Sequence, residues 1–212
     1  MPPWQRQSSR LVHHTDLFEL YEDVLRRPEG GTLLYTRLES PSFSTIVPVT
    51  EHGEIVFVEQ YRPPLGGYLL ELPGGMIEKG EDPMTAAYRE LEEETGYRAL
   101  DLQRLGWYYP SPHLGRHRGH LFVARRLRRG KAHLDPYEDL RVVTLPIELA
   151  YDRLRGGDLH QSTTMLALYL AEPLLFPERG PPHRRPQGMG TKRGPRRARS
   201  GRGRPTGVWG GR

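Results

Sequence analysis

Residues 71–97 constrain this chain more than any other part of its 212 residues, because they read as a glycine-rich loop followed by one helix. Asp82 precedes Pro83, the usual arrangement of an N-cap residue before a proline at the first helical position. Gly96 stands where a helix needs a left-handed residue to end. The stretch therefore predicts a helix over residues 83–95, about three and a half turns long.

The two faces of this predicted helix differ in character. One face is apolar at i, i+3, i+4 and i+7 spacing and should be buried; it carries Met84, Ala87, Tyr88 and Leu91. The neighbouring face carries Glu90, Glu93 and Glu94, which repel one another by roughly 0.2–0.5 kcal/mol per pair. A divalent cation would reverse that sign, because Mg2+ or Mn2+ binds through carboxylates together with substrate phosphates. A solvated acidic helix face is the alternative interpretation of these glutamates.

The fixed residues of the stretch also follow a recognisable spacing, Gly-x5-Glu-x7-Arg-Glu-U-x-Glu-Glu-x-Gly-U, where U is a bulky apolar residue. Its fixed positions are occupied by Gly75, Glu81, Arg89, Glu90, Glu93, Glu94 and Gly96. Tyr97 stands where an aliphatic residue is commoner. The chain thus resembles the Nudix hydrolases, in which this motif forms a loop, a helix and a loop. A motif with so many fixed positions is far more specific than a lone Gly-x-Gly-x-x-Gly.

The resemblance extends over roughly residues 16–175 and favours the ADP-ribose pyrophosphatase branch of the family. Three short sequences are similar to those of that branch: Glu59-Gln-Tyr-Arg62, Glu71-Leu-Pro-Gly-Gly and Tyr109-Pro-Ser-Pro112. Members of the branch typically have a proline about sixteen residues beyond the last glycine of the motif, and Pro112 lies sixteen residues beyond Gly96. The resemblance implies a homodimer whose N-terminal strands swap across the interface, so that both chains line the substrate pocket. It also implies hydrolysis of ADP-ribose to AMP and ribose 5-phosphate.

Several residues take metal and catalytic roles by this resemblance. Glu90, Glu93 and Glu94 become metal ligands and catalytic carboxylates, with the backbone carbonyl of Gly74 as a further oxygen donor for Mg2+ or Mn2+. Metal charge neutralises developing phosphate oxyanions and lowers the pKa of a water, so that hydroxide is available at neutral pH.

Other residues of the motif are expected to support the site rather than bind the metal. Glu81 and Arg89 should form an ion pair that fixes the loop against the helix, and Gly75 and Gly96 are structural. Loss of either charge should therefore loosen the site without removing a ligand.

Three residues are implied as substrate-binding: Arg62, Glu71 and Pro112. Arg62 leaves a predicted strand toward the pocket, where its fork of donors could grip a phosphate. A surface arginine whose stem covers an apolar residue is the alternative interpretation of Arg62.

The loop of residues 111–120 departs from the branch, which usually places a glutamate there as general base or metal ligand. This loop has no carboxylate, and the glutamate's place falls near His117. A histidine can accept a proton near neutral pH, so His117 is a candidate base. The alternatives are that the motif glutamates supply the base, or that the enzyme is slow or prefers another substrate. A mobile His- and Arg-rich loop that only attracts phosphate is the structural alternative.

Charge divides the chain into two dissimilar parts. Residues 177–212 contain eleven Lys and Arg against one acid, so the remainder is net acidic although the whole chain is +5. This tail is rich in Gly and Pro and is expected to be disordered, either as a basic arm that contacts nucleic acid or another polyanion, or as a dispensable extension. With no cysteine and no long apolar run, we expect a cytoplasmic protein with no membrane segment.

The remaining patterns predict an α+β fold. Residues 1–15 are polar and expected to be flexible, and residues 16–176 form the Nudix domain. Strands are expected at residues 18–25, 32–38, 43–50, 54–60, 68–72, 105–109, 120–125 and 140–145, and further helices at 146–155 and 163–175. The first two strands form an antiparallel hairpin, and the next two are expected to pair. A mixed sheet between helices follows, the α/β/α sandwich typical of Nudix proteins.

Three function classes remain open on the sequence. The first is metal-dependent hydrolysis of a nucleoside diphosphate linked to another moiety, with ADP-ribose favoured. The second is hydrolysis of other nucleotide sugars, nucleoside triphosphates or RNA ends, for which the basic tail is the pointer. The third is a nucleotide-binding module without catalysis, for which the missing loop carboxylate is the pointer. The intact motif favours an enzyme.

Overall fold

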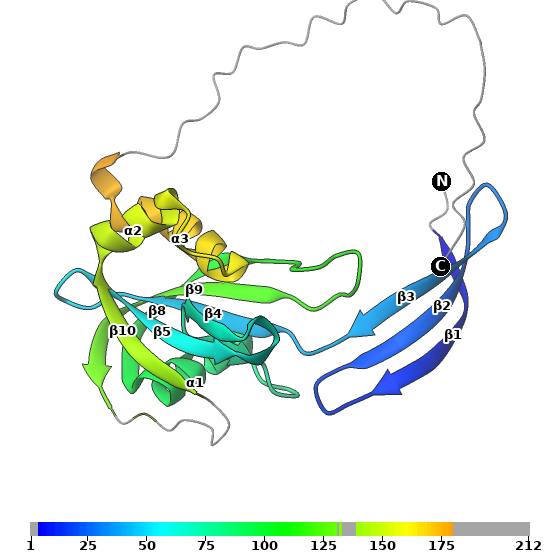
Figure 1. Cartoon of the computed structure of the whole chain (residues 1–212), viewed down its shortest axis with the longest axis horizontal. Helices are drawn as coiled ribbons and strands as arrows, with labels where there is room; N and C mark the ends of the chain where they lie inside the picture. Colours follow the sequence, from blue (N-terminus) through cyan, green and yellow to red (C-terminus); the bar gives the residue numbers. More distant parts are fainter. Residues whose placement is uncertain (1–3, 131, 133–138, 180–212) are drawn as a thin grey trace, which may run out of the picture. The chain divides into compact units, whose positions relative to one another are not determined.

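The central sheet of the computed structural model is mixed, and it includes Gly74 and Gly75 of the glycine loop. The structure describes residues 4–130, 132 and 139–179 (Figure 1). Strand β4 runs parallel to β9, whereas β7 and β8 are antiparallel to their neighbours. In order across the sheet, the strands are β7 (Gly74–Met76), β4 (Phe43–Pro48), β9 (Gly119–Arg129) and β8 (Tyr97–Tyr108).

Helices cover both faces of this sheet (Figure 1). Successive strand residues point to opposite sides, so each face offers apolar side chains to a different helix. Ile46 lies in a buried cluster with Ala87 and Leu91 of α1, whereas its neighbour Val47 lies in the larger cluster with Leu168 of α3. The predicted α+β sandwich, with a sheet between helices, is confirmed. The helices are α1 (Pro83–Thr95), α2 (Ile147–Gly156) and α3 (Ser162–Leu175), with short 3-10 turns η1 (Pro63–Leu65) and η2 (Pro177–Arg179).

A second, antiparallel sheet has the strand order β10-β5-β6. The predicted pairing of residues 43–50 with 54–60 is wrong, because β4 and β5 belong to different sheets. A single bridge, between Val49 and Ile55, and the backbone hydrogen bond from Thr50 to Glu54 join their ends. Both partners of β4 come from more distant parts of the chain, which a local turn signal does not reveal. The strands of this second sheet are β5 (Glu54–Arg62), β6 (Gly67–Glu71) and β10 (Leu140–Pro146).

The N-terminal sheet has three strands rather than two, which corrects the expectation that residues 1–15 are flexible. Strand β1 pairs antiparallel with β2 over its whole length, from Gln5 to His14, with two register shifts. Polar contacts fix it: the Ser9 hydroxyl donates to Asp23 at 2.6 Å, and Arg10 pairs with Glu22. Every residue of β1 is exposed, so its sequence lacks the alternation of a half-buried strand. The strands are β1 (Gln5–His14), β2 (Glu19–Arg26) and β3 (Thr32–Glu39).

The C-terminal boundary also differs from the prediction. Residues Pro177–Arg179 form η2, directly after Phe176, which is buried, so the domain extends slightly beyond residue 176. The rest of the predicted tail, residues 180–212, lies outside the described residues. None of the helices in the described part of the chain is long and apolar enough to span a membrane.

Candidate active site

Two glycines bring the loop before α1 close to the central sheet. Gly74 and Gly75 pair with Thr45 and Ser44 of β4. Gly74 has a φ of 155°, and a Cβ there would lie 2.2 Å from the Ser44 carbonyl oxygen. A Cβ on Gly75 would lie 2.5 Å from the Glu90 carboxyl group. The motif therefore needs glycine at these positions because backbone and carboxylate occupy the space of a side chain.

Gly75→Ala tests this close approach. Because the new methyl group would displace the Glu90 carboxyl group, we expect a loss of about 1–3 kcal/mol in the free energy of unfolding, together with at least a tenfold drop in turnover. Gly106→Ala is the matched control, since a Cβ at Gly106 meets no atom within 4 Å. Urea unfolding and turnover, measured on both variants, would contradict the account if Gly75→Ala behaved like Gly106→Ala.

The ends of α1 are fixed as the sequence predicts. The Asp82 side chain accepts a hydrogen bond from the Met84 N–H at 2.8 Å, and Pro83 is the first helical residue. Gly96 ends the helix with a φ of 70°, and its N–H donates to the Glu92 carbonyl at 2.8 Å. Capping residues thus fix where the helix that carries the glutamates begins and ends.

The buried face of α1 is rotated relative to the prediction. Tyr88, expected to be buried, is 38% exposed, and Ala86 is fully buried instead. Glu90 and Glu94 are also buried, with 9% and 4% exposure. The helix therefore turns part of its acidic side inward, and the solvated acidic face considered as an alternative is excluded for these two glutamates.

Arg89 is the centre of an ion-pair network that ties the loop to the helix. Its Nε and Nη2 atoms donate to the two carboxylate oxygens of Glu81, each at 3.0 Å, which confirms the predicted pair. Nη2 also donates to the Met76 carbonyl at 2.9 Å, and Nη1 donates to Glu90 at 2.7 Å and to Glu93 at 3.0 Å. Hydrogen bonds to Arg89 hold the pKa of Glu81 below its ordinary value, and those to Glu81 and Glu90 raise the pKa of Arg89. Arg89 thus offsets the repulsion between the carboxylates.

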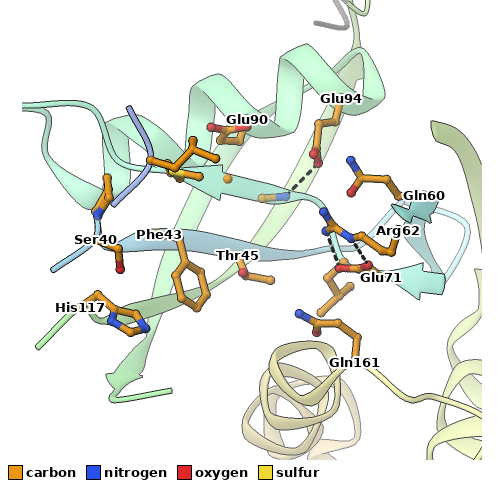
Figure 2. A pocket seen from close by; sticks show the side chains of 16 residues that line it. Ser40, Phe43, Thr45, Gln60, Arg62, Glu71, Glu90, Glu94, His117 and Gln161 are labelled. Atoms are coloured by element: carbon orange, nitrogen blue, oxygen red, sulfur yellow. Dashed lines mark hydrogen bonds and ion pairs between the residues drawn. The ribbon is translucent and has the colours of Figure 1, made fainter. Parts of the chain in front are cut away.

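Glu90 and Glu94 line a cavity of about 470 Å³ that also takes in Gly74 and Gly75 (Figure 2). The Gly74 N–H donates to the Glu94 Oε2 at 2.9 Å, so the backbone of the glycine loop holds this carboxylate in place. Glu93 does not line this cavity, and its side chain is 41% exposed. The structure therefore brings two of the three predicted ligands, Glu90 and Glu94, to one cavity wall. The third, Glu93, lies outside the cavity and pairs with Arg89.

The donor set at this wall fits a divalent cation. Its side-chain donors are carboxylate oxygens, the ligands that hard cations such as Mg2+ prefer. The missing side chain of Gly75 leaves the room that the Glu90 carboxyl group occupies. Within residues 4–130, 132 and 139–179, no three His, Asp or Glu side chains already converge on one point, because Arg89 holds Glu90 and Glu93. A cation at this wall would therefore have to compete with the Arg89 guanidinium.

Arg62 and Glu71 meet in the same cavity. Nε and Nη2 of Arg62 donate to Glu71 at 2.7 and 2.9 Å, a bidentate pair with a carboxylate that is only 4% exposed (Figure 2). This pair gives the Arg62 guanidinium a partner at the cavity wall. Sequence reasoning missed Gln60 and Gln161, which also line the cavity. Gln60 could have been found, because it lies two residues before Arg62 on a strand and so shares its face.

His117 lines the cavity beside Ser40 and Phe43 (Figure 2). Its Nδ1 atom is buried and has no hydrogen-bond partner within the part of the chain that the structure describes. Backbone hydrogen bonds tie its loop to neighbouring strands, from Leu38 N–H to Leu114 at 2.8 Å and from Phe43 N–H to Arg118 at 2.9 Å. The loop is therefore anchored on both sides of His117.

Pro112 lies apart from the other predicted substrate-binding residues. It is exposed in the turn that begins the loop and does not line the cavity with Arg62 and Glu71. Residues 112–114 are exposed in this turn. Of the described loop residues 109–118, His117 is the one that lines the cavity. The role of Pro112 in binding substrate stays a prediction.

Comparisons with known proteins agree with this geometry. The family model for the NUDIX domain matches residues 40–162. An ADP-ribose pyrophosphatase from Bacillus subtilis (strain 168) is 32% identical over 154 residues, which cover 72% of this chain and 83% of that protein. A methanol dehydrogenase activator from Bacillus methanolicus is 34% identical over 152 residues, 71% of this chain and 82% of that protein.

A solved structure described as an ADP compounds hydrolase has a TM-score of 0.76 and 25% identity, and the match covers 85% of this chain and 97% of that one. The match of the family model extends from the start of the central sheet to the start of α3, so it includes the whole glycine loop and α1. This chain therefore belongs to the Nudix family of hydrolases, whose members generally need a divalent metal.

Proposed function

We propose that this chain hydrolyses the diphosphate bond of a nucleoside diphosphate linked to another moiety, with ADP-ribose as the substrate and AMP and ribose 5-phosphate as products. One observation carries the proposal: buried Glu90 and Glu94 share a cavity with the Arg62–Glu71 pair. Carboxylates that could bind a metal ion and an arginine that could bind phosphate thus line the same cavity. The name of the Bacillus subtilis relative supports ADP-ribose in particular.

The chain's own residues would divide the work as follows. Glu90, Glu93 and Glu94, with the Gly74 carbonyl, would hold Mg2+ or Mn2+, which when bound supplies Lewis acidity toward the diphosphate and toward water. Arg62 would bind a phosphate oxygen, because Glu71 fixes its guanidinium at the cavity wall. The Gly74 N–H would hold the Glu94 carboxylate in one orientation.

His117 is the candidate general base of this proposal, because it lines the cavity from a tethered loop that carries no carboxylate. His117→Ala should then lower turnover of ADP-ribose by about a hundredfold, the usual contribution of a positioned base. His113→Ala is the control, since His113 is exposed and does not line the cavity. A His117→Ala rate near that of wild type would assign proton removal to the glutamates of α1 instead.

A homodimer is also proposed, because the N-terminal sheet exposes apolar side chains. Leu11, Val12 and Leu34 are 49%, 43% and 62% exposed on β1 and β3, and a second copy could cover them. Light scattering should give twice the chain mass, and Leu34→Lys should give the monomer mass.

A polyanion contact of the tail stays a prediction, since residues 180–212 lie outside the described part of the chain. A cytoplasmic location stays a prediction as well.

A substrate screen tests the proposed function. The purified chain would be given ADP-ribose, other nucleotide sugars, dinucleoside polyphosphates and nucleoside triphosphates, each with Mg2+ and with Mn2+. We expect the highest kcat/KM for ADP-ribose. A higher kcat/KM for triphosphates or dinucleoside polyphosphates would replace ADP-ribose with that class, and no turnover of any compound would favour a binding module.

A further inference from the structure

A second cavity, of about 570 Å³, borders the first, and apart from His117 its lining residues have no role in the proposed reaction. Ser40 and His117 line both cavities, so the two spaces meet at the loop that follows β8. The rest of its wall comes mainly from that loop and the start of β9. The residues on which the following argument depends are Glu39, Tyr109, Arg116, Arg118 and His120.

His120 is a buried polar side chain in the wall of this second cavity. It is 8% exposed, and its Nδ1 atom has no hydrogen-bond partner within the described residues. Most buried polar atoms in proteins do have such a partner. His120 is therefore a lining residue of this cavity with a ring nitrogen whose hydrogen-bonding capacity is unused among the described residues.

The electrostatic field at His120 is positive. Burial lowers the pKa of His120, and Arg104 and Arg118 lower it further, against a smaller opposite effect of Asp82. Arg116 and Arg118 also line the cavity. The acid of the wall, Glu39, is already paired with Arg37 and lies 3.6 Å from Arg116. An anion in this cavity would therefore be stabilised by the field and would itself favour the charged form of the histidine.

Arg118 is held in place before any ligand binds. Its guanidinium lies over the Trp107 ring, 4.4 Å from the centroid, and its Nη2 atom is 3.4 Å from the Tyr109 hydroxyl. The two rings meet edge to face at 5.2 Å, and the Arg118 N–H donates to the Ser42 hydroxyl at 3.0 Å. Little side-chain entropy remains to be lost on binding, so this guanidinium is pre-organised for an anion.

We propose that this second cavity binds a phosphate monoester, with Arg118 and His120 donating hydrogen bonds to the phosphate oxygens and Arg116 adding positive charge. A phosphate monoester fits because it is close to a dianion at neutral pH and offers several acceptor oxygens to a guanidinium fork. The ester could be a nucleotide such as AMP or a sugar phosphate such as ribose 5-phosphate, which share this chemistry. The site would act beside the reaction cavity and not in it.

Tryptophan fluorescence of the full chain tests the proposal directly, because Trp107 stacks on Arg118. AMP, ribose 5-phosphate and inorganic phosphate would each be titrated in EDTA, at constant ionic strength, so that no turnover occurs. We expect at least one ester to give a saturable change that disappears in Trp107→Phe. Arg118→Gln should weaken binding of that ester at least tenfold. Arg128→Gln should leave it within twofold, because Arg128 is exposed near the other end of the same strand, β9.

The outcomes distinguish a nucleotide from a sugar phosphate as the ligand, and they can refute the proposed site. Tighter binding of AMP assigns a nucleotide, and tighter binding of ribose 5-phosphate assigns a sugar phosphate. Inorganic phosphate bound as tightly as either ester would overturn the ester assignment. Equal affinities in Arg118→Gln and Arg128→Gln, or no saturable change, would overturn the site itself. Because the titration involves no metal and no turnover, failure of the proposed hydrolysis would leave this result unaffected.

Discussion

Glu94→Gln should lower turnover of ADP-ribose by about a thousandfold while leaving the fold intact. That ratio corresponds to roughly 4 kcal/mol in the activation barrier, the scale of several kcal/mol that a metal-linked charge contributes. The amide oxygen of glutamine can still accept the Gly74 N–H, so the loop keeps its anchor. The side chain is 4% exposed, and a neutral amide is cheaper to bury than a carboxylate. The Tm should therefore stay within about 3 °C of wild type.

A glutamine at a neighbouring glutamate provides the matched control. Glu92 lies on the same helix, but it pairs with Arg98 and does not line the cavity. Glu92→Gln should keep turnover within about twofold of wild type, because a surface ion pair contributes little. Turnover of Glu94→Gln within threefold of wild type would remove Glu94 from the proposed ligand set.

Arg89→Met should cause a large loss of stability. It removes the hydrogen bonds to Glu81, Glu90, Glu93 and the Met76 carbonyl at once. Glu90 and Glu81 are little-exposed carboxylates that would each lose their hydrogen bonds from Arg89, so we expect a loss of about 2–3 kcal/mol in the free energy of unfolding. In a domain of this size that is a fall of roughly 5–10 °C in Tm. Turnover should fall as well, because Glu90 loses one of its anchors.

Arg98→Met is the control for this change. Arg98 pairs with Glu92 beside the end of α1, but its side chain is 66% exposed. Its loss should leave the Tm within about 1 °C of wild type. A fall in Tm as large as that of Arg89→Met would mean that any charge removed near α1 destabilises the domain, and that the buried network has no special part.

The Arg89 network also predicts how stability depends on pH. Arg89 holds the pKa of Glu81 below its ordinary value of 4.5. This contribution is therefore complete above pH 4.5 and is lost as the pH falls through the pKa of the folded state. Urea midpoints of wild type and Arg89→Met should consequently differ less in acid than at neutral pH. A difference that stays constant down to about pH 3 would contradict the role of Glu81.

The local parts of the fold could be predicted from the sequence, because their causes are local. Asp82, Pro83 and Gly96 fix both ends of α1 by capping chemistry, and the structure places the helix over Pro83–Thr95. The opposite charges of Glu81 and Arg89 meet as expected, and Glu93 lies four residues after Arg89, a helical spacing that allows their pair. The spacing gave no sign that Arg89 also holds Glu90, its neighbour in the sequence. That additional contact depends on the side-chain conformations of Arg89 and Glu90, which spacing along the chain does not determine.

The long-range parts could not be predicted in the same way. Strand β4 takes β9 as its parallel partner from far along the chain, whereas its turn suggested a hairpin with β5. Strand β1 has no apolar alternation to reveal it, because both of its faces are exposed and polar contacts fix it. Gln161 reaches the cavity from the start of α3, and only the packed fold brings it beside Glu71. Residues in such positions are determined by packing and not by spacing.

The central claim is that the carboxylate wall of α1 supports hydrolysis of a diphosphate bond, and product analysis tests it most directly. ADP-ribose and Mg2+ would be incubated with the wild-type chain, with Glu94→Gln and with wild type in EDTA, and the products separated by anion exchange. We predict equal amounts of AMP and ribose 5-phosphate from wild type, and almost none from the variant or in EDTA. Products that form equally fast in Glu94→Gln, or no cleavage by wild type, would contradict the claim.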